Sequence, residues 1–244
     1  VTSGGTLTFT SANWNTLQTV TVTGQDDLIA DGNVAYTVQV SAGSTDTNYN
    51  TLPAQTVYLN SVDNGVPGFT ITPATSAGSP LTTTEAGGTD TYNVVLTSQP
   101  TANVTITSTV NTPPTPAEGQ ITTGASLTFT TANWNIAQQV IVTGVNDFIV
   151  DGNVAYTVQV TSGSSDPNYN ALPAQTVYLV NTDNDVAGFT ISPATTAGDP
   201  LITTEAAGIN HTATYTVVLT SKPATSVTIT STVLAPPTPA EGQI

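Results

Sequence analysis

The sequence predicts an all-β protein built from tandem, immunoglobulin-like antiparallel sandwiches of about seven strands each. The chain has 244 residues and repeats itself almost unchanged after 120 positions. Within each repeat, apolar and polar residues alternate over short stretches rich in Val, Ile, Thr and Tyr, which is typical of strands. No stretch shows a convincing helical period. Because solenoid repeats span only about 20–45 residues, a repeat of this length indicates whole domains in tandem.

The repeat is read from three motifs. LTFTSANWN at 7–15 returns as LTFTTANWN at 127–135, and DGNVAYTVQV at 31–40 returns unchanged at 151–160. LPAQTVYL at 52–59 returns in the same phase. Beyond Glu205 the offset becomes 123 because of an insertion. The chain therefore contains about two periods, and since it starts at Val1 without a signal peptide, we interpret it as a mature piece or a fragment.

Seven strands are expected in the central copy, separated by turn signals such as SQPTA and TANWN. They are 68–73 continuing after a kink to 84, 90–97, 103–110, 126–130, 138–143, 153–160 and 175–181. Seven short strands with regular turns favour an immunoglobulin-like sandwich.

These strands predict three domains or parts of domains. A complete domain is expected at 66–185. Residues 1–65 would be the C-terminal part of one repeat, with its last four strands, and residues 186–244 the N-terminal part of another. Such halves would expose apolar faces and open edges, so either they complete each other, within or between chains, or the segment belongs to a continuous array.

Composition excludes several classes of function. Sixteen acidic residues face a single Lys and no Arg, giving a formal net charge of −15. Without cations to replace phosphate counterions the chain is not expected to bind nucleic acid, and it is not expected to bind anionic membranes. No apolar run reaches the roughly 20 residues of a membrane span. The absence of Cys removes disulfides and thiolate metal sites.

The acidic residues gather at one predicted tip of each sandwich. Alternate strands of an antiparallel sandwich run the same way, so the first, third and fifth loops and the exit of the last strand share a tip. In the central copy these loops hold Glu85, Glu118, Asp147, Asp151 and the stretch 183–185. Two like charges roughly 5 Å apart cost on the order of 3 kcal/mol at an effective dielectric near 20. A bound Ca²⁺, which takes six to eight oxygen ligands in flexible geometry, offsets this repulsion better than Mg²⁺ does.

The same residues carry a resemblance to a known family. Each repeat resembles a Calx-β domain, a calcium-binding sandwich of sodium–calcium exchangers and large bacterial surface proteins. The resemblance lies in the order of four motifs: GxLTF, VTVTG-x-DD, DGNVAYTVQV and a closing DND. The resemblance implies calcium ligation by Glu85, Asp147, Asp151, Asp183 and Asp185, with Glu118 and Asn184 as further candidates. In the flanking copies it implies Asp26, Asp27, Asp31, Asp63 and Glu205. Departures from the family pattern are Asn146, Gly65 and the AEG around Glu118.

Some of these features also allow other interpretations. The acids could simply be turn formers, which accounts for Asp166 but not for the bias to one tip. His211, the only His, has no counterpart in the preceding copy, and neither a catalytic triad nor a glycosidase pair is supported, so no enzyme is expected. Trp14 and Trp134 are expected to anchor the sandwich end, with sugar stacking as the lesser interpretation, and Tyr49 and Tyr169 carry the same ambiguity.

The predicted function is that of a calcium-binding structural repeat in an extracellular or cell-surface adhesin, stalk or filament, where calcium rigidifies the junctions between domains. The expected partners are neighbouring repeats of the same protein, including self-assembly into a fibre. One alternative is a carbohydrate- or surface-binding module that uses loop Trp and Tyr residues. Another is a non-catalytic stalk attached to an enzyme.

Overall fold

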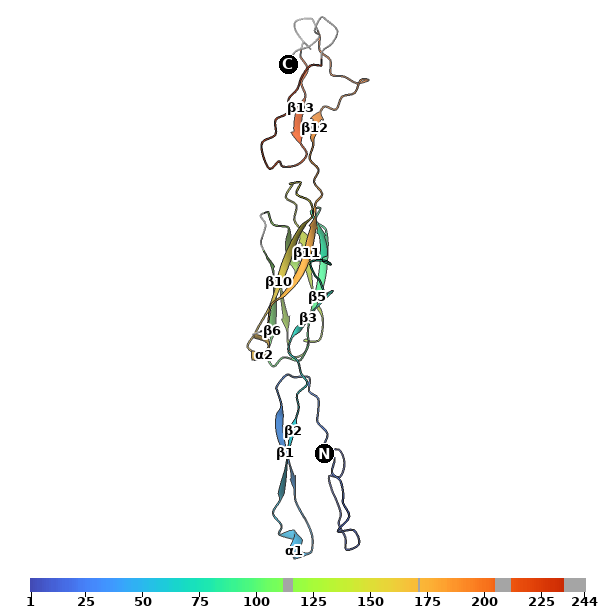
Figure 1. Ribbon diagram of the computed structural model, residues 1–244, viewed down its shortest axis with the longest axis vertical. Helices are drawn as coiled ribbons and strands as arrows, with labels where there is room; N and C mark the ends of the chain where they lie inside the picture. Colours follow the sequence, from blue (N-terminus) through green and yellow to red (C-terminus); the bar gives the residue numbers. More distant parts are fainter. Residues whose placement is uncertain (112–115, 171, 205–211, 235–244) are drawn as a thin grey trace.

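The computed structural model describes residues 1–111, 116–170, 172–204 and 212–234. Figure 1 shows three parts that follow one another along the long axis of the molecule. Nine strands between β3 and β11 form a sandwich in the middle part, and a pair of strands lies on either side of it.

The central sandwich consists of two sheets. Strands β4 (Leu81–Thr84), β11 (Gln175–Thr182), β10 (Val154–Ser164), β6 (Val104–Asn111) and β8 (Ser126–Phe129) form one sheet in that order. Strands β3 (Phe69–Thr72), β5 (Thr89–Leu96), β9 (Gln138–Gly144) and β7 (Gly119–Thr123) form the other. All pairs are antiparallel except β4 and β11, which run parallel. This is the all-β sandwich that the alternating pattern predicts.

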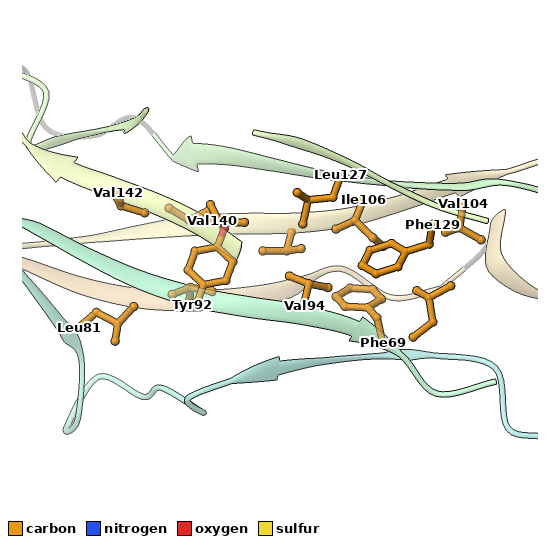
Figure 2. Packing of buried hydrophobic residues seen from close by; sticks show 14 of the residues in the cluster. Phe69, Leu81, Tyr92, Val94, Val104, Ile106, Leu127, Phe129, Val140 and Val142 are labelled. Atoms are coloured by element: carbon orange, nitrogen blue, oxygen red, sulfur yellow. The ribbon is translucent and has the colours of Figure 1, made fainter. Parts of the chain in front are cut away.

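The core lies between the two sheets because inward and outward positions alternate along each strand. Tyr92 and Val94 of β5 and Val140 and Val142 of the neighbouring β9 all point toward the other sheet, and all four are fully buried. Phe129 and Phe69 close the end of the core that lies away from Tyr92 (Figure 2). The hydroxyl of Tyr92 donates to Ser108 Oγ at 2.8 Å, so this buried polar group has a partner.

Two strand predictions were incomplete. The expected first strand, 68–84, is two strands, because Pro73 and Pro80, which have no N–H to donate, flank the stretch where the chain passes from one sheet to the other. Strand β7 lies in what the sequence suggested was a loop. It pairs only with β9, and the register shifts between Ile121 and Thr123. The middle part therefore has nine strands where about seven were expected.

The flanking parts contain short elements. Before the sandwich, β1 (Val34–Val40) pairs with β2 (Gln55–Ser61), and the one-turn helix α1 (Thr47–Asn50) lies between them. After it, β12 (Phe189–Ser192) pairs with β13 (Thr216–Leu219). The helix α2 (Pro167–Asn170) occupies the place of α1 in the central repeat. In the described residues, no helix has the length and apolar character needed to cross a lipid bilayer.

Candidate metal centre

Four segments bring acidic side chains to the end of the sandwich that leads toward β12. Glu85 directly follows β4, where its N–H donates to Thr182 O and extends the pairing with β11. Glu118 directly precedes β7, and its carbonyl accepts from Val145 N. Asp147 and Asp151 lie in the loop between β9 and β10, and 183–185 follow β11. Strands β4, β7 and β11 therefore fix the backbone beside Glu85, Glu118 and 183–185, and the loop with Asp147 and Asp151 is held between β9 and β10.

Two carboxylate clusters result, and they share one residue. Glu85, Asp147 and Asp185 each place an oxygen within 4.8 Å of the others. Glu118, Asp147 and Asp151 do the same. Asp147 therefore lies between two groups of three oxygen ligands. Both groups consist of hard oxygen donors, which suit Ca²⁺.

Within the part of the chain that the structure describes, three buried oxygens at this tip have no hydrogen-bond partner. They are Glu118 Oε1, Asp147 Oδ2 and Asp185 Oδ2. Glu118 is only 4% exposed. A buried carboxylate oxygen without a partner is costly, and each of the three belongs to one of the clusters. A cation bound in each cluster would give these oxygens a partner, so the residues present fit a calcium site.

Burial and mutual repulsion act on the carboxylates in the same direction. Burial raises the pKa of Glu85, and the nearby Asp183, Asp147 and Asp185 charges raise it further. Burial likewise raises the pKa of Glu118, with added repulsion from Asp151 and Asp147. The pKa of Asp151 is also raised, first by desolvation and then by Asp147. Without a cation these groups hold their protons more tightly than free carboxyls do.

A polar network beneath the site orients Glu118. Asn181 Nδ2 donates to Glu118 Oε2 at 3.2 Å and to Val145 O at 3.0 Å. The Oδ1 atom of Asn181 accepts from Thr83 Oγ1 at 3.1 Å, and Thr83 Oγ1 lies 2.9 Å from the hydroxyl of Tyr156. Sequence reasoning missed these three residues because each lies within a strand, where Asn, Thr and Tyr are ordinary. Their common feature, inward-facing polar positions in β4, β10 and β11, becomes visible only when the strand faces are known.

Asp183 and Asn184 lie at the tip but outside both clusters. Asp183 Oδ1 accepts from Asp185 N at 2.7 Å, and Oδ2 accepts from Gly152 N at 2.8 Å. These backbone donors lower the pKa of Asp183, and the two hydrogen bonds hold the loop in shape. Asn184 is exposed, and its backbone N–H donates to Glu85 Oε2 at 3.2 Å. Both residues position the loop beside the clusters, and their ligation of calcium stays a prediction.

The preceding copy repeats this local geometry. Asp63 accepts from Gly32 N and from Gly65 N, both at 2.7 Å, as Asp183 accepts from Gly152 and Asp185. The Oδ1 atom of Asp27 accepts from Ile29 N at 3.1 Å, which matches Asp147 and Ile149. Asp26 and Asp31 line the same surface hollow as Asp27 and Asp63. Glu205 lies outside the described residues.

The acid and aromatic residues of the opposite tip have structural roles. The two oxygens of Asp166 accept from Asn168 N and from the N–H and hydroxyl of Thr101, so this acid caps a turn. The side chain of Tyr169 is buried, and its hydroxyl contacts Ser98. It therefore offers no face for a sugar.

The tryptophans differ between the copies. Trp134 packs against the core of the sandwich, as an anchor is expected to do. Trp14 and Tyr49, the counterparts in the preceding copy, are exposed. His211 lies outside the described residues.

The fold and the site together define an all-β sandwich with a carboxylate-lined tip. No protein-family model matches the chain, and no curated protein matches it. Solved structures that resemble it include the E. coli chaperone DraB, at 12% identity and a TM-score of 0.35, covering 50% of this chain and 59% of the chaperone.

Two further solved structures that resemble the chain are single domains. The PapD-like domain 7 of human CEP192 has 14% identity and a TM-score of 0.33, over 48% of this chain and 86% of that domain. The apo form of the Calx CBD1 domain has 16% identity and a TM-score of 0.29, over 42% of this chain and 90% of that domain. At these scores the fold rests on the strands described above, and the function rests on the site.

Proposed function

We propose that this chain is a calcium-binding, Calx-β-like structural repeat of an extracellular or cell-surface protein, in which calcium stiffens the junctions between neighbouring repeats. The observation that carries the proposal is the group of three buried, partnerless oxygens on Glu118, Asp147 and Asp185. They lie in two clusters that share Asp147. The chain offers a single Lys and no Arg to offset its sixteen acidic residues, and this residue, Lys222, is exposed.

The loop that carries the ligands also contacts the following repeat. Phe148, next to Asp147, has a φ of 64°, and its carbonyl accepts from Lys222 N at 2.7 Å. Leu28 has the same φ of 64°, and its carbonyl accepts from Gln99 N at 2.8 Å. The two junctions therefore use the same contact, with a conformation that non-glycine residues rarely adopt.

A mechanical link follows from these contacts. Asp147 Oδ1 holds Ile149 N at 2.8 Å, while its Oδ2 is the buried atom that is free for a cation. An ion bound at Oδ2 would immobilise Asp147, and through it the turn whose carbonyl at Phe148 holds the next repeat. Calcium would thereby restrict bending at the junction.

Calcium titration calorimetry on the chain and its variants tests this proposal. Because Asp147 belongs to both clusters, Asp147→Asn should remove two ions per chain relative to the wild type. Asp151→Asn and Asp185→Asn should each remove one. Asp46→Asn, which changes an exposed acid outside the clusters, serves as the control and should leave the count unchanged. Equal calcium uptake by the wild type and Asp147→Asn would contradict the proposal.

A further inference from the structure

The linker of the first junction, between β2 and the sandwich, is tied to the parts on both of its sides. Asp63 Oδ1 accepts from Gly65 N at 2.7 Å, which fixes the linker to the part that precedes it. Val66 O accepts from Thr97 Oγ1 at 2.6 Å, which fixes the next residue of the linker to the sandwich. Gly65 is therefore the residue at which the two parts meet.

The linker of the second junction, between β11 and β12, repeats this frame. Asp183 Oδ1 accepts from Asp185 N at 2.7 Å, and Val186 O accepts from Thr220 Oγ1 at 2.6 Å. The residue between these two bonds is different, because Asp185 occupies the position that Gly65 has in the first linker. The two junctions therefore share their hydrogen bonds and differ in one side chain.

Gly65 lies directly against the loop that reaches the sandwich. A Cβ added to it would lie 2.7 Å from Ile29 O and 2.9 Å from both Ala30 N and Ala30 Cα, which leaves no room for a side chain. Leu28 O of the same loop accepts from Gln99 N at 2.8 Å, and Ile29 forms a bridge with Gln99. The missing Cβ therefore lets the linker, the loop and the sandwich pack together directly.

Asp185 does not allow the same packing at the second junction. Its Cβ occupies the space that the loop takes up in the first junction, so the loop that carries Phe148 cannot lie as close to its linker. Phe148 O still accepts from Lys222 N at 2.7 Å, but among the described residues no bridge pairs Ile149 with Lys222. The side chain of Asp185 belongs instead to the carboxylate cluster around Asp147, where its Oδ2 is one of the buried oxygens without a partner.

We propose that Gly65 makes the first junction a direct joint, which stays rigid without an ion, and that Asp185 leaves the second junction flexible until a cation binds. Relative motion is the default for domains that share a small interface. Close packing of linker against loop removes this motion at the first junction only. The statement on Asp185 rests on the proposed calcium site, and the statement on Gly65 does not.

Distances between paired spin labels test the first junction in chelator. The chain contains no Cys, so labels attach only where Cys is introduced, at the exposed Thr37 and Gln159. We expect a broader distance distribution in Gly65→Ala than in the otherwise unchanged chain, because the new Cβ forces the loop away from the linker. Gly43→Ala is the matched control, since no described atom lies within 4 Å of a Cβ added there, and it should leave the distribution unchanged.

The reciprocal change is made at the second junction, again in chelator, with labels at Gln159 and the exposed Val218. Asp185→Gly and Asp185→Ala both remove the carboxylate, and they differ from each other in one Cβ. Asp185→Gly should give a narrower distribution than Asp185→Ala, because only glycine lets the loop close on the linker. This gain of rigidity cannot come from misfolding.

A broader distribution in Gly65→Ala together with a narrower one in Asp185→Gly would support the proposal. Equal widths for glycine and alanine at either junction would overturn it. Added calcium should narrow the second distribution of the wild type and leave the first unchanged, and a chain that binds calcium in titration without this narrowing would overturn the statement on Asp185. A chain that binds no calcium would contradict the proposed function and that statement together, while the comparison of glycine with alanine in chelator still decides the direct joint.

Discussion

At the scale of single residues, Glu118 is the most buried carboxylate of the second cluster, and its environment decides its protonation state. Its carboxylate is buried, accepts one hydrogen bond from Asn181 Nδ2 on Oε2, and leaves Oε1 without a partner. Repulsion from Asp151 and Asp147 adds to the cost of ionising it. Folding without calcium therefore places a carboxylate in an environment that favours its protonated form.

This environment predicts an unusual dependence of stability on pH. Because the pKa of folded Glu118 is raised above its ordinary value of 4.5, its proton-linked stabilisation is fully present below that value and is lost as the pH rises through the raised pKa. The same sign applies to Glu85. In chelator, the melting temperature should therefore be higher at about pH 5 than at about pH 7. Asp183, with its lowered pKa, contributes the opposite slope only at more acidic pH.

Thermal unfolding of the wild type and Glu118→Gln in chelator measures this effect. The variant removes the charge but keeps an oxygen for Asn181 to bond, so its melting temperature should fall less between these two pH values. Calcium should reverse the slope in the wild type, since protons compete with the ion for the same oxygens. A wild type that becomes steadily more stable from about pH 5 to 7 in chelator would contradict the account.

At the scale of elements, the candidate site is formed by residues at the ends of strands, and Gly144 allows these ends to pack closely against one another. Gly144, the last residue of β9, lies so close to its neighbours that a Cβ there would collide with Thr84 O and Asn181 Oδ1. Thr84 directly precedes Glu85, and Asn181 holds Glu118 through its Nδ2. The position therefore couples close backbone packing to the geometry of both clusters.

Gly144→Ala should accordingly weaken both stability and calcium binding. Overpacking of a fixed site costs about 1–3 kcal/mol, and displacement of Asn181 would release Glu118. Gly163→Ala is the matched control, because no atom lies within 4 Å of a Cβ added there. Chemical denaturation and calcium titration of the two variants provide the comparison. Equal stability of the two variants would show that the close approach at Gly144 is not required.

Much of the strand layout could be predicted from the sequence. The expected strands at 90–97, 103–110, 138–143 and 175–181 overlap β5, β6, β9 and β11, because period-two alternation is strong where both sheets bury one face. Strand β7 was missed because it is an edge strand with one partner and an irregular register. The crossing from β3 to β4 was seen only as a kink, since sheet membership depends on distant partners.

The candidate site could be predicted only in outline. Loop direction in an antiparallel sandwich was enough to place Glu85, Glu118, Asp147 and Asp185 at one tip. The sequence could not show that Asp183 is occupied by backbone donors, nor that Asn181 supports Glu118. Both depend on distances between loops that are far apart along the chain.

At the scale of the whole molecule, few hydrogen bonds join the first part to the sandwich among the described residues. Between the first part and the sandwich, Leu28 O accepts from Gln99 N and Ala30 O accepts from Asn168 Nδ2 at 2.6 Å. Few other hydrogen bonds between these two parts are found among the described residues. Bending is therefore controlled by a small number of contacts from the loop that carries Asp27 and Asp31.

Asn168→Ala should loosen this junction without touching any carboxylate. Small-angle scattering should then show a shorter and broader distribution of interatomic distances than in the wild type, while calcium uptake stays the same. Gln159→Ala, an exposed change on β10 remote from the junction, should leave the scattering unchanged. Identical scattering profiles for Asn168→Ala and the wild type would show that this contact does not limit bending at the junction.

The carboxylate tip is tested most directly by anomalous diffraction from crystals grown in calcium. Two peaks are predicted in the central sandwich, one among Glu85, Asp147 and Asp185 and the other among Glu118, Asp147 and Asp151. Well-ordered carboxylates with no anomalous density between them, in crystals that contain ample calcium, would contradict the claim that these buried oxygens exist to hold divalent ions.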